Sequence, residues 1–448
     1  MINCDQTLSI SNGKMKVAIE GCCHNQLEEI YKTLEHIENG ENIKIDLLLI
    51  CGDFETIRNT EDFNSMSVPA KYRTLGSFYK YYTGECKVPY PTLFVGGNHE
   101  VMSYLWELYY GGWVCENIYF LGYAGVVNFG GLRIGGLSGI YNDRHYDLGH
   151  HETLPYNTST VRSAYHMRKY DAFKLAQIKQ PLDIFLSHDW PRKITNFGKL
   201  DDLLHIKPYL RQDIESGKLG SAACEELLFK LKPRYWFAAH HHVKFPAIVY
   251  HDERTSSIYQ SEEMNSKTIK NPDEINIDID EDLENPDEIN IDSTTSQPHI
   301  SEDERRDQIP CTKFLALDKC LPGREFLQIL DFPEANGQLE FSYDEEWLAI
   351  TKATHEFLNL SFNAVSLPRE SVIQSKIDPE LRWIRENISQ KAVGLVIPHN
   401  FQPTAPAYGE QQTFILQKPF KNPQTEAFTR LLNMSNKINP DGQSRPQE

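Results

Sequence analysis

Three short apolar runs in the first hundred residues constrain the fold more than any other feature of the sequence. They are KVAIEG (16–21), IDLLLICGD (45–53) and TLFVGG (92–97). Such runs, which reach a glycine at or near their ends, are typical of strands that are buried on both faces. The stretch LEEIYKTLEHI between the first two has apolar residues at helical spacing. A strand, a helix and a strand in this order predict parallel pairing with right-handed crossovers.

The same alternation of strand-like and helix-like patterns continues, and it indicates more than one sheet. AGVVNF and LRIGGLSG flank Gly130 and Gly131, which predicts a β-hairpin. Further strand-like runs are DIFLSH (183–188), YWFAAH (235–240), VKFPAIVY (243–250), TKFLALDKC (312–320) and FLQILDF (326–332). Helix-like patterns fill residues 161–179, 201–216 and 221–231. We therefore expect an α/β fold of layered sheets and helices.

The distribution of charge matters more than its total. The 448-residue chain has a net charge of −18, which by itself argues against a polyanionic ligand. Residues 1–250, however, hold 26 Lys and Arg against 28 Asp and Glu, whereas residues 251–310 hold 5 against 18. The acidic segment contains NPDEINID twice, at 271–278 and 285–292. We expect a disordered insertion there, with a peptide that docks on a partner as the alternative. The nearly neutral first 250 residues remain compatible with phosphate contacts.

These shifts in composition predict the domain organisation. We expect an N-terminal extension (1–14), a main domain (15–250, completed by 311–334), an acidic insertion (251–310) and a small C-terminal domain with a disordered tail (335–448). No apolar run approaches the roughly 18 residues of a membrane span, and the N-terminus lacks the features of a secretory signal. The nine cysteines, an odd number, suit a reducing compartment.

Polar residues of the types that bind metals follow five of the expected strands directly. They are Cys22-Cys23-His24, Cys51-Gly52-Asp53, Gly97-Asn98-His99-Glu100, Ser187-His188-Asp189 and His240-His241-His242. Sites in open α/β sheets form at the carboxyl ends of the strands, so parallel pairing would bring these groups together. Each group alone has a simpler interpretation as a turn, a core cysteine or a satisfied histidine. Five in succession favour a site for one or two divalent ions.

The two adjacent cysteines of the first group are not equivalent. Neighbours in an extended chain point to opposite sides, so Cys22 and His24 share one side and Cys23 points into the core. The pair is therefore not expected to act as a redox couple. Cys51 lies within its strand and is expected to be a core residue. Cys22 either bonds the metal or only crowds its position, and the sequence leaves both open.

The same alternation separates the three consecutive histidines. His240 and His242 share one side, so we interpret His241 as a non-ligand. Asp189 follows His188 directly, and it is either a hydrogen-bond partner that orients the ligand or part of a surface turn.

These groups also carry a resemblance to a known family. GDFE, GGNHE, LSHDW and AHHH are similar, in the same order, to the motif blocks of the calcineurin-like metallophosphoesterases, and GCCH places Cys22 where that family has an aspartate. Longer runs, among them YGGWVCENIYFLGYAGV, LSGIYNDRHYDLGHHE and TKFLALDKCLPGREFL, resemble the RNA lariat debranching enzymes. This resemblance covers most of residues 15–250 and 311–332. It becomes loose beyond about residue 345.

The resemblance implies a metallophosphoesterase β-sandwich flanked by helices in an αββα order, with metal at the strand tips. Carried over residue by residue, it implies two metal positions that share one ligand, Asp53. The implied ligands are Cys22, His24, Asp53 and His242 for the first metal, and Asp53, Asn98, His188 and His240 for the second. The thiolate at Cys22 favours Zn(II) or Fe(II) over Mg(II), and we expect Fe(II), Zn(II) or Mn(II) as the cofactor.

The resemblance also implies the catalytic and substrate-binding residues. His99 would be the general acid beside the scissile phosphate. Residues 139–165 would correspond to the loop that grips branched RNA in this family, and we call them the recognition segment. Its candidate RNA contacts are Arg144, His145, Tyr146 and His150, although a solvated loop would have the same composition.

The implied activity is metal-dependent hydrolysis of the 2′–5′ phosphodiester at the branch point of excised intron lariat RNA. The alternative is a metallophosphoesterase that acts on another phosphoester, such as a phosphoprotein or a nucleotide phosphodiester. A non-enzymatic scaffold is not favoured, because ligand types are present in every block. The expected partner is branched RNA and not a membrane. A location in the nucleus, or in both nucleus and cytoplasm, rests on the resemblance, since the sequence has no long basic run of the kind that marks nuclear import.

Overall fold

The computed structural model describes residues 14–252, 309–391, 394–410 and 416–442. The chain divides into one compact unit formed by Met1–Val249 with Thr312–Glu448, and a second formed by Tyr250–Cys311. In the second unit, the N–H of His251 donates to the carbonyl of Pro310. The two acidic repeats lie outside the described residues, as does nearly all of the expected N-terminal extension. The account that follows concerns the first unit.

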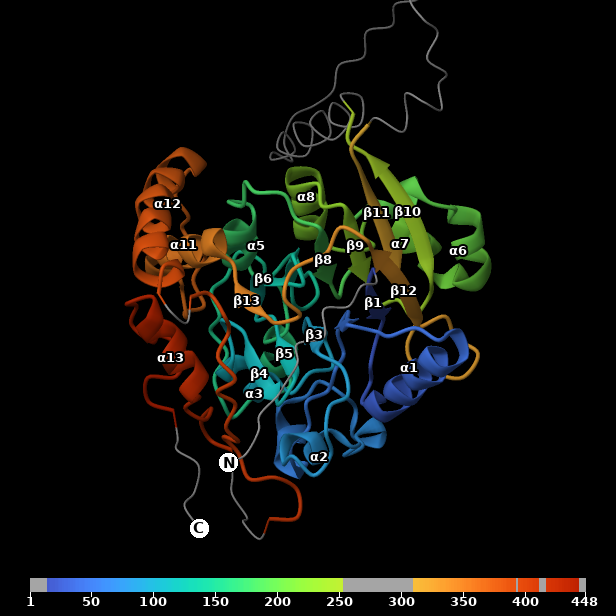
Figure 1. Ribbon diagram of the computed structural model, residues 1–448, viewed down its shortest axis with the longest axis horizontal. Coiled ribbons are helices and arrows are strands. Elements are labelled where there is room, and N and C mark those ends of the chain that lie inside the picture. The colour runs from blue at the N-terminus through green and yellow to red at the C-terminus, as the bar shows by residue number, and fades with distance from the viewer. Residues whose placement is uncertain (1–13, 253–308, 392–393, 411–415, 443–448) are drawn as a thin grey trace, which may run out of the picture. The chain divides into compact units, whose positions relative to one another are not determined.

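Thirteen strands among the described residues form two mixed sheets (Figure 1). The first sheet has the order β12 (Leu327–Phe332), β1 (Met15–Glu20), β2 (Leu47–Ile50), β3 (Thr92–Phe94), β5 (Ile118–Phe120) and β4 (Gly112–Cys115). The second has the order β10 (Phe245–Tyr250), β11 (Cys311–Ala316), β9 (Tyr235–Ala238), β8 (Ile184–Ser187), β7 (Leu132–Leu137), β6 (Ala124–Phe129) and β13 (Ser342–Tyr343). Strands β1, β2, β3 and β5 run parallel, as do β7, β8, β9 and β11. The parallel pairing that the apolar runs predict is therefore confirmed.

Strand β1 shows why the sequence folds in this way. Val17 and Ile19 pack into the core between the sheets, whereas Ala18 belongs to the core on the side of the helices. All three are fully buried. Strand β2 repeats the pattern, with Leu49 between the sheets and Leu48 on the helix side. Both faces of these strands are covered, so the sequence shows continuous apolar runs instead of alternation. Burial of each large aliphatic side chain contributes about 1.5–3 kcal/mol.

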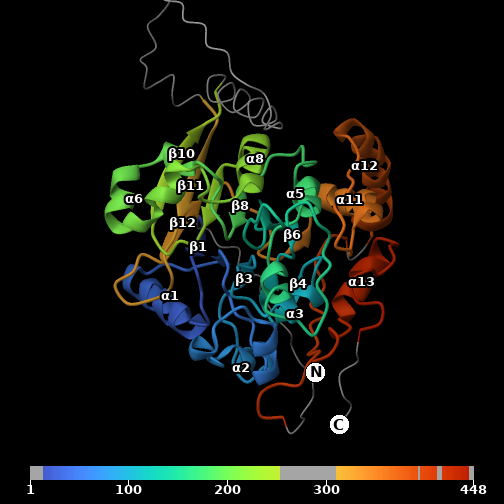
Figure 2. The ribbon, with the colours of Figure 1, turned by 180° about the vertical axis from the view of Figure 1, so that it is seen from behind.

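Helices cover the outer faces of the sheets (Figures 1 and 2). Helix α1 (Leu27–Glu41) buries Leu27, Ile30 and Leu34 at helical spacing. It ends where Asn42 adopts a left-handed conformation and donates its N–H to the carbonyl of Glu38. The other α-helices of the described residues are α2 (Phe78–Tyr82), α3 (Met102–Glu107), α4 (Thr160–Ser163), α5 (Lys169–Leu175), α6 (Leu200–Ile206), α7 (Arg211–Glu215), α8 (Ala222–Leu231), α11 (Glu345–Thr354), α12 (Glu370–Ile384) and α13 (Pro423–Leu431).

The predicted hairpin is confirmed, and two predicted helices are not continuous: the pattern at 201–216 is broken at Pro208 into α6 and α7, and that at 161–179 is broken as well. Strands β6 and β7 pair antiparallel around Gly130 and Gly131, which have φ angles of +61° and +88°. The pattern at 161–179 instead forms two short helices, α4 and α5. Between them, the N–H of Met167 donates to the carbonyl of Ile140 at 2.9 Å. This contact with the recognition segment replaces a helical hydrogen bond and interrupts the helix.

The C-terminal residues pack against both sheets. Strand β13 extends the second sheet beside β6. At the edge of the first sheet, the side chain of Gln424 accepts the N–H of Trp113 and donates to its carbonyl, both at 2.8 Å. Arg58, fully buried, donates to the hydroxyl of Thr404. The boundaries that we expect for the domains stay a prediction. Among the described residues, no helix is long and apolar enough to cross a membrane.

Candidate metal centre

The carboxyl ends of β1, β2 and β9 bring four possible metal ligands together. One donor atom each from Cys22, His24, Asp53 and His242 can be chosen so that all four lie within 4.8 Å of one another. Nε2 of His24 is 3.0 Å from Nε2 of His242 and 3.6 Å from Oδ2 of Asp53. His24, Asp53 and His242 are far apart in the sequence, so the packing of the two sheets creates the cluster. Its thiol, imidazole and carboxylate donors fit a divalent transition metal.

Asp53 also faces a second group of donors. Its Oδ2 is 3.4 Å from Nε2 of His188, and that same nitrogen is 3.2 Å from Oδ1 of Asn98. The rings of His188 and His240 are 5.0 Å apart between centroids. Asp53 thus lies between the two groups. The structure brings together all seven residues that the sequence suggests as ligands.

Hydrogen bonds around His188 leave its inner nitrogen available for a metal. Its Nδ1 lies 2.8 Å from the carbonyl oxygen of Cys51, so Nδ1 carries the proton and donates. In the neutral ring, Nε2 is then the unprotonated nitrogen, directed toward Asp53. His24 has a comparable contact on its Nδ1, which lies 3.2 Å from Oε1 of Glu55. A carboxylate on the far nitrogen fixes the ring and raises its basicity as a ligand.

The backbone is unusually constrained where the ligands leave the strands. His24, Asp53, His240 and His242 all have positive φ angles, between +44° and +64°. Non-glycine residues adopt this region at a cost, and such residues cluster at functional sites. Glycine is required beside them. A Cβ added at Gly52 would lie 2.4 Å from Nδ1 of His188.

Glu100 holds two of the ligand-bearing turns together. Its carboxylate, fully buried, accepts the backbone N–H groups of Phe54, Glu55 and Gly97 at 2.8–2.9 Å. Burial and then the charge of Asp53 raise the pKa of Glu100 to about 7, against the three backbone hydrogen bonds. Sequence reasoning assigned no role to Glu55 or Glu100. The fourth letter of GNHE was the available signal for Glu100.

The charge state of Asp53 follows from its neighbours. Burial alone would raise the pKa of its carboxyl, but His188 and then His24 and His99 lower that pKa well below its ordinary range. Asp53 is therefore a carboxylate at neutral pH. Burial raises the pKa of the Cys22 thiol, and the charge of Asp53 adds to the effect. A thiolate at Cys22 therefore needs a cation beside it.

His99 is placed by the same carboxylate. The backbone N–H of His99 donates to Oδ1 of Asp53 at 2.9 Å. The centroid of the His99 ring lies 5.2 Å from that of the His24 ring. The side chain is partly exposed. It therefore stands at the open edge of the cluster, where a substrate can meet it.

The neighbours of the ligands divide between the core and the site. Cys22 and Cys51 belong to the core between the sheets, and Cys23 belongs to the core on the helix side, so the opposite orientations of Cys22 and Cys23 are confirmed. His241 is directed toward Trp190, with 5.0 Å between ring centroids. Its donor atoms nevertheless come within 4.8 Å of those of Asp189 and His240, so the role of His241 stays a prediction.

Asp189 does not orient His188 in the structure. Its carboxylate accepts the backbone N–H of Tyr141 at 3.0 Å and that of Trp190 at 2.9 Å. Burial raises the pKa of this carboxyl to about 6. Asp189 therefore connects the tip of β8 to the start of the recognition segment.

Two of the four suggested RNA contacts are engaged with other rings, and one is in the interior. Arg144 is exposed. Nδ1 of His145 lies 2.6 Å from Nδ1 of His166, and the ring of Tyr146 packs on that of Tyr141 at 5.1 Å between centroids. His150 is buried, and its Nε2 lies 2.7 Å from Oδ2 of Asp171. The structure therefore does not place His150 where it would touch a ligand at the surface.

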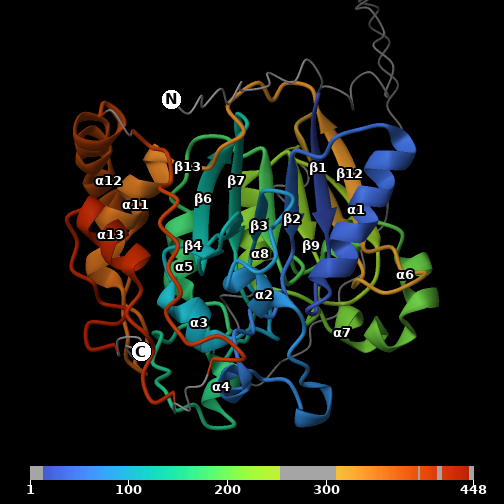
Figure 3. The ribbon, with the colours of Figure 1, turned by 60° about the horizontal axis from the view of Figure 1, so that its bottom comes forward.

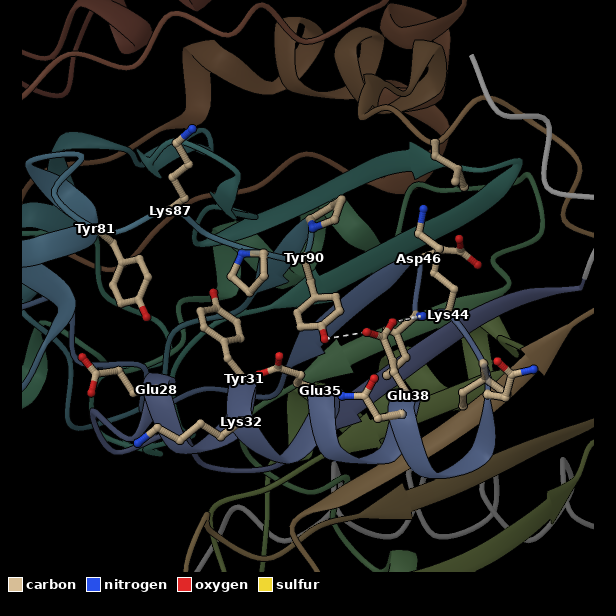
Figure 4. Close-up of a pocket in the computed structure, with 17 residues that line it drawn as sticks. Glu28, Tyr31, Lys32, Glu35, Glu38, Lys44, Asp46, Tyr81, Lys87 and Tyr90 are labelled. Carbon is tan, nitrogen blue, oxygen red and sulfur yellow. Dashed lines mark hydrogen bonds between the residues drawn. The ribbon is translucent and has the colours of Figure 1, made fainter. Parts of the chain in front are cut away.

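A groove of about 850 Å³ runs along α1 but does not include any of the suggested ligands (Figure 4). Glu28, Glu35 and Glu38 line it, together with Lys32 and Tyr90. The hydroxyl of Tyr90 donates to Oε2 of Glu38 at 2.9 Å. The carboxylates along this groove would repel a phosphate backbone. The metal centre is thus the candidate functional site.

Comparisons with known proteins agree with this geometry. Residues 15–244 match a family model described as calcineurin-like phosphoesterase. Residues 310–437 match one described as the C-terminal domain of lariat debranching enzyme. The chain is 45% identical to the lariat debranching enzyme of Arabidopsis thaliana over 422 residues, which cover 94% of this chain and 86% of the relative.

Relatives from animals give a similar result. The chain is 43% identical to the lariat debranching enzyme of Danio rerio, over 96% of this chain and 68% of the relative. It is 42% identical to that of Homo sapiens, over 94% and 69%. With a metallophosphoesterase fold, a cluster of metal ligands at its strand ends and these relatives, the chain belongs to the lariat debranching enzyme family.

Proposed function

We propose that the chain hydrolyses the 2′–5′ phosphodiester at the branch point of excised intron lariat RNA, and so linearises it. As a member of this family it is a hydrolase with a lariat phosphodiester as its substrate. The observation that carries the proposal is the position of Asp53, which lies between two groups of metal ligands and also fixes the backbone of His99. The alternative, another phosphoester as substrate, has no observation in its favour.

The donor set fits divalent metal ions. The roles of Asp53 and His99 follow from their places beside it. When bound, such ions supply positive charge to the phosphate and make water a stronger acid. Asp53, ionised at neutral pH, holds its place between the ligand groups. His99 would donate a proton to the departing 2′-oxygen, because an alkoxide is a poor leaving group. Turnover by this route leaves a 2′-hydroxyl on the branch nucleotide and a 5′-phosphate on the released strand.

We further propose Fe(II), Zn(II) or Mn(II) as the native metal. The thiol of Cys22 supports this choice, because soft sulfur ligands favour Zn(II) and Fe(II) over Mg(II). Arg144 and the exposed part of the recognition segment are the proposed RNA contacts. A nuclear location is proposed from the substrate, since introns are excised there.

Two variants test the roles of the site. Asn98→Ala removes a suggested ligand, so we expect both metal content and branch cleavage to fall. His99→Ala removes the suggested acid, so we expect metal content to stay and cleavage to fall by at least a hundredfold. His36→Ala is the matched control, because His36 is exposed on α1. Retained turnover in both site variants would contradict the proposal.

A further inference from the structure

A group of basic residues lies beside the metal centre on the side away from the recognition segment. It consists of Lys207, Lys319 and Arg324, and we call it the basic rim. Lys319 pairs with Cys22 in an isolated parallel β-bridge. In that bridge, the backbone carbonyl of Cys22 accepts the N–H of Cys320 at 3.3 Å. One member of the basic rim, Lys319, is therefore attached to the backbone of a suggested metal ligand.

The strand order places the basic rim and the recognition segment on opposite sides of the ligands. In the second sheet, β9 and β8 lie between β11 and β7. Strands β8 and β9 lead to His188 and His240. The recognition segment follows β7, whereas Lys319 follows β11. Figure 3 shows the corresponding separation, with α4 of the recognition segment well apart from α6, which precedes Lys207.

The charges of the basic rim are crowded and largely uncompensated. Lys207 and Lys319 form no ion pair with any residue in the described parts of the chain. Arg324 pairs with the buried carboxylate of Asp318 at 3.3 Å. Burial lowers the pKa of Lys207; Asp318 opposes this, and Arg324 and Lys319 lower it further. The nearby Glu325 is already paired with Lys244 at 3.0 Å. Such like charges create a positive surface potential that attracts a polyanion.

Exposed apolar side chains lie next to these charges in the sequence. Tyr209, two residues after Lys207, is 67% exposed, and Leu321, two residues after Lys319, is 41% exposed. Surfaces that bind single-stranded nucleic acid combine cations for the phosphates with aromatic rings on which bases stack. Tyr209 provides such a ring. The chemistry of this surface is therefore that of an RNA contact.

We propose that the basic rim binds the phosphate backbone of one arm of the branched RNA, across the metal centre from the recognition segment. The inference rests on the proposed function. Three strands leave a branch point, so a single segment on one side cannot hold all of them. Contacts on both sides would fix the scissile phosphate at the ligands between them.

The salt dependence of branch cleavage tests this proposal. Each phosphate contact with a single strand contributes about 0.7 to the slope of log affinity against log salt. The double variant Lys207→Gln/Lys319→Gln removes two contacts, so the slope of log kcat/KM should become less steep by about 1.4. The same relation predicts a loss of about tenfold in kcat/KM near 0.15 M salt.

Two further variants serve as controls. Lys418→Gln/Lys421→Gln removes the same net charge from exposed lysines that precede α13, which lies far from α6 in Figure 1. It should leave the slope and kcat/KM as in the wild type. Lys207→Arg/Lys319→Arg retains both charges and should also match the wild type. Where the double glutamine variant does not fold, Lys319→Gln alone should give half of the change in slope.

The outcomes separate the two proposals. Normal cleavage by the wild type with an unchanged slope in the double glutamine variant would overturn the basic rim alone. Failure of the wild-type holoenzyme to cleave branched RNA would overturn the proposed function, and the inference with it. A less steep slope in Lys207→Gln/Lys319→Gln, together with a wild-type slope in Lys207→Arg/Lys319→Arg, supports the basic rim as an RNA contact.

Discussion

Arg168, three residues beyond the recognition segment, forms a buried ion pair with Glu152 of that segment, with 2.5 Å between Nη2 and Oε1. The same guanidinium, fully buried, donates to the carbonyls of Gly149, Ser163 and His166. One side chain at the start of α5 therefore ties the middle of the segment, at Gly149 and Glu152, to its C-terminal end at Ser163. A buried residue just outside the segment therefore helps to set its conformation, although Arg144 within the segment is exposed.

Arg168→Gln should disturb RNA binding without touching the metal ligands. Loss of one partner of a buried ion pair costs about 3–5 kcal/mol, so the free energy of unfolding should fall by that order. We expect KM for branched RNA to rise by at least tenfold. Hydrolysis of a small phosphodiester should change little. Initial rates on both substrates check this.

Lys169→Gln is the matched control for that variant. Lys169 is the next residue, and it forms an exposed ion pair with Asp147 at 2.7 Å. Exposed pairs contribute about 0–1 kcal/mol, so stability and KM should be nearly those of the wild type. An equal effect of the two substitutions would argue against a positioning role for Arg168.

The contact between His145 of the recognition segment and His166, just beyond the segment, should lose stability in acid. Burial, then His145 and Arg168, lowers the pKa of His166 to about 3. A histidine with a lowered pKa contributes stability that is present above its unfolded pKa of about 6.5 and is lost as pH falls toward 3. By pH 4.5 this loss amounts to roughly 3 kcal/mol, at about 1.4 kcal/mol for each pH unit below 6.5. His166→Gln does not titrate, so denaturant unfolding at pH 7 and 4.5 should show a smaller loss than in the wild type.

Gly52→Ala should abolish metal loading. Gly52 has a φ angle of +112°, and an added Cβ would meet the His188 ring. Gly84 provides a matched control, because its φ angle is +76° but a Cβ there has no neighbour within 4 Å. Gly84→Ala should therefore cost only backbone strain, about 1–2 kcal/mol. Metal analysis of the purified variants distinguishes the two, and full loading of Gly52→Ala would refute the packing described at β2.

Cys22→Asp should shift the preference for metals. A carboxylate is a harder ligand than a thiolate, so activity with Mg(II) or Mn(II) should rise relative to Zn(II) or Fe(II). The variant should also resist inactivation by peroxide in the metal-free state, because the thiol is removed. Rates across these metals provide the measurement. An unchanged order of metals would indicate that Cys22 crowds the site without bonding.

Much of the fold and the grouping of the suggested donors at the strand ends could be predicted because both depend on local patterns. Apolar runs mark the strands, and the residues that follow them carry recognisable donor chemistry, as in Asp53 and His188. The supporting residues were not predictable in the same way. Glu55, Glu100 and Arg168 act through contacts between distant segments, and a lone carboxylate or guanidinium has no periodicity that reveals such a contact. His150 was misleading for a similar reason, since the buried Asp171 that binds it is 21 residues away.

The central claim is most directly tested with a synthetic RNA that contains one 2′–5′ branch and ordinary 3′–5′ linkages. The wild-type protein is incubated with it in the presence of Fe(II), Zn(II) or Mn(II) and a reductant. We predict cleavage only at the branch, with a 5′-phosphate on the released strand and a 2′-hydroxyl on the branch nucleotide. An intact branch, under conditions in which the protein hydrolyses a small phosphodiester, would contradict the account.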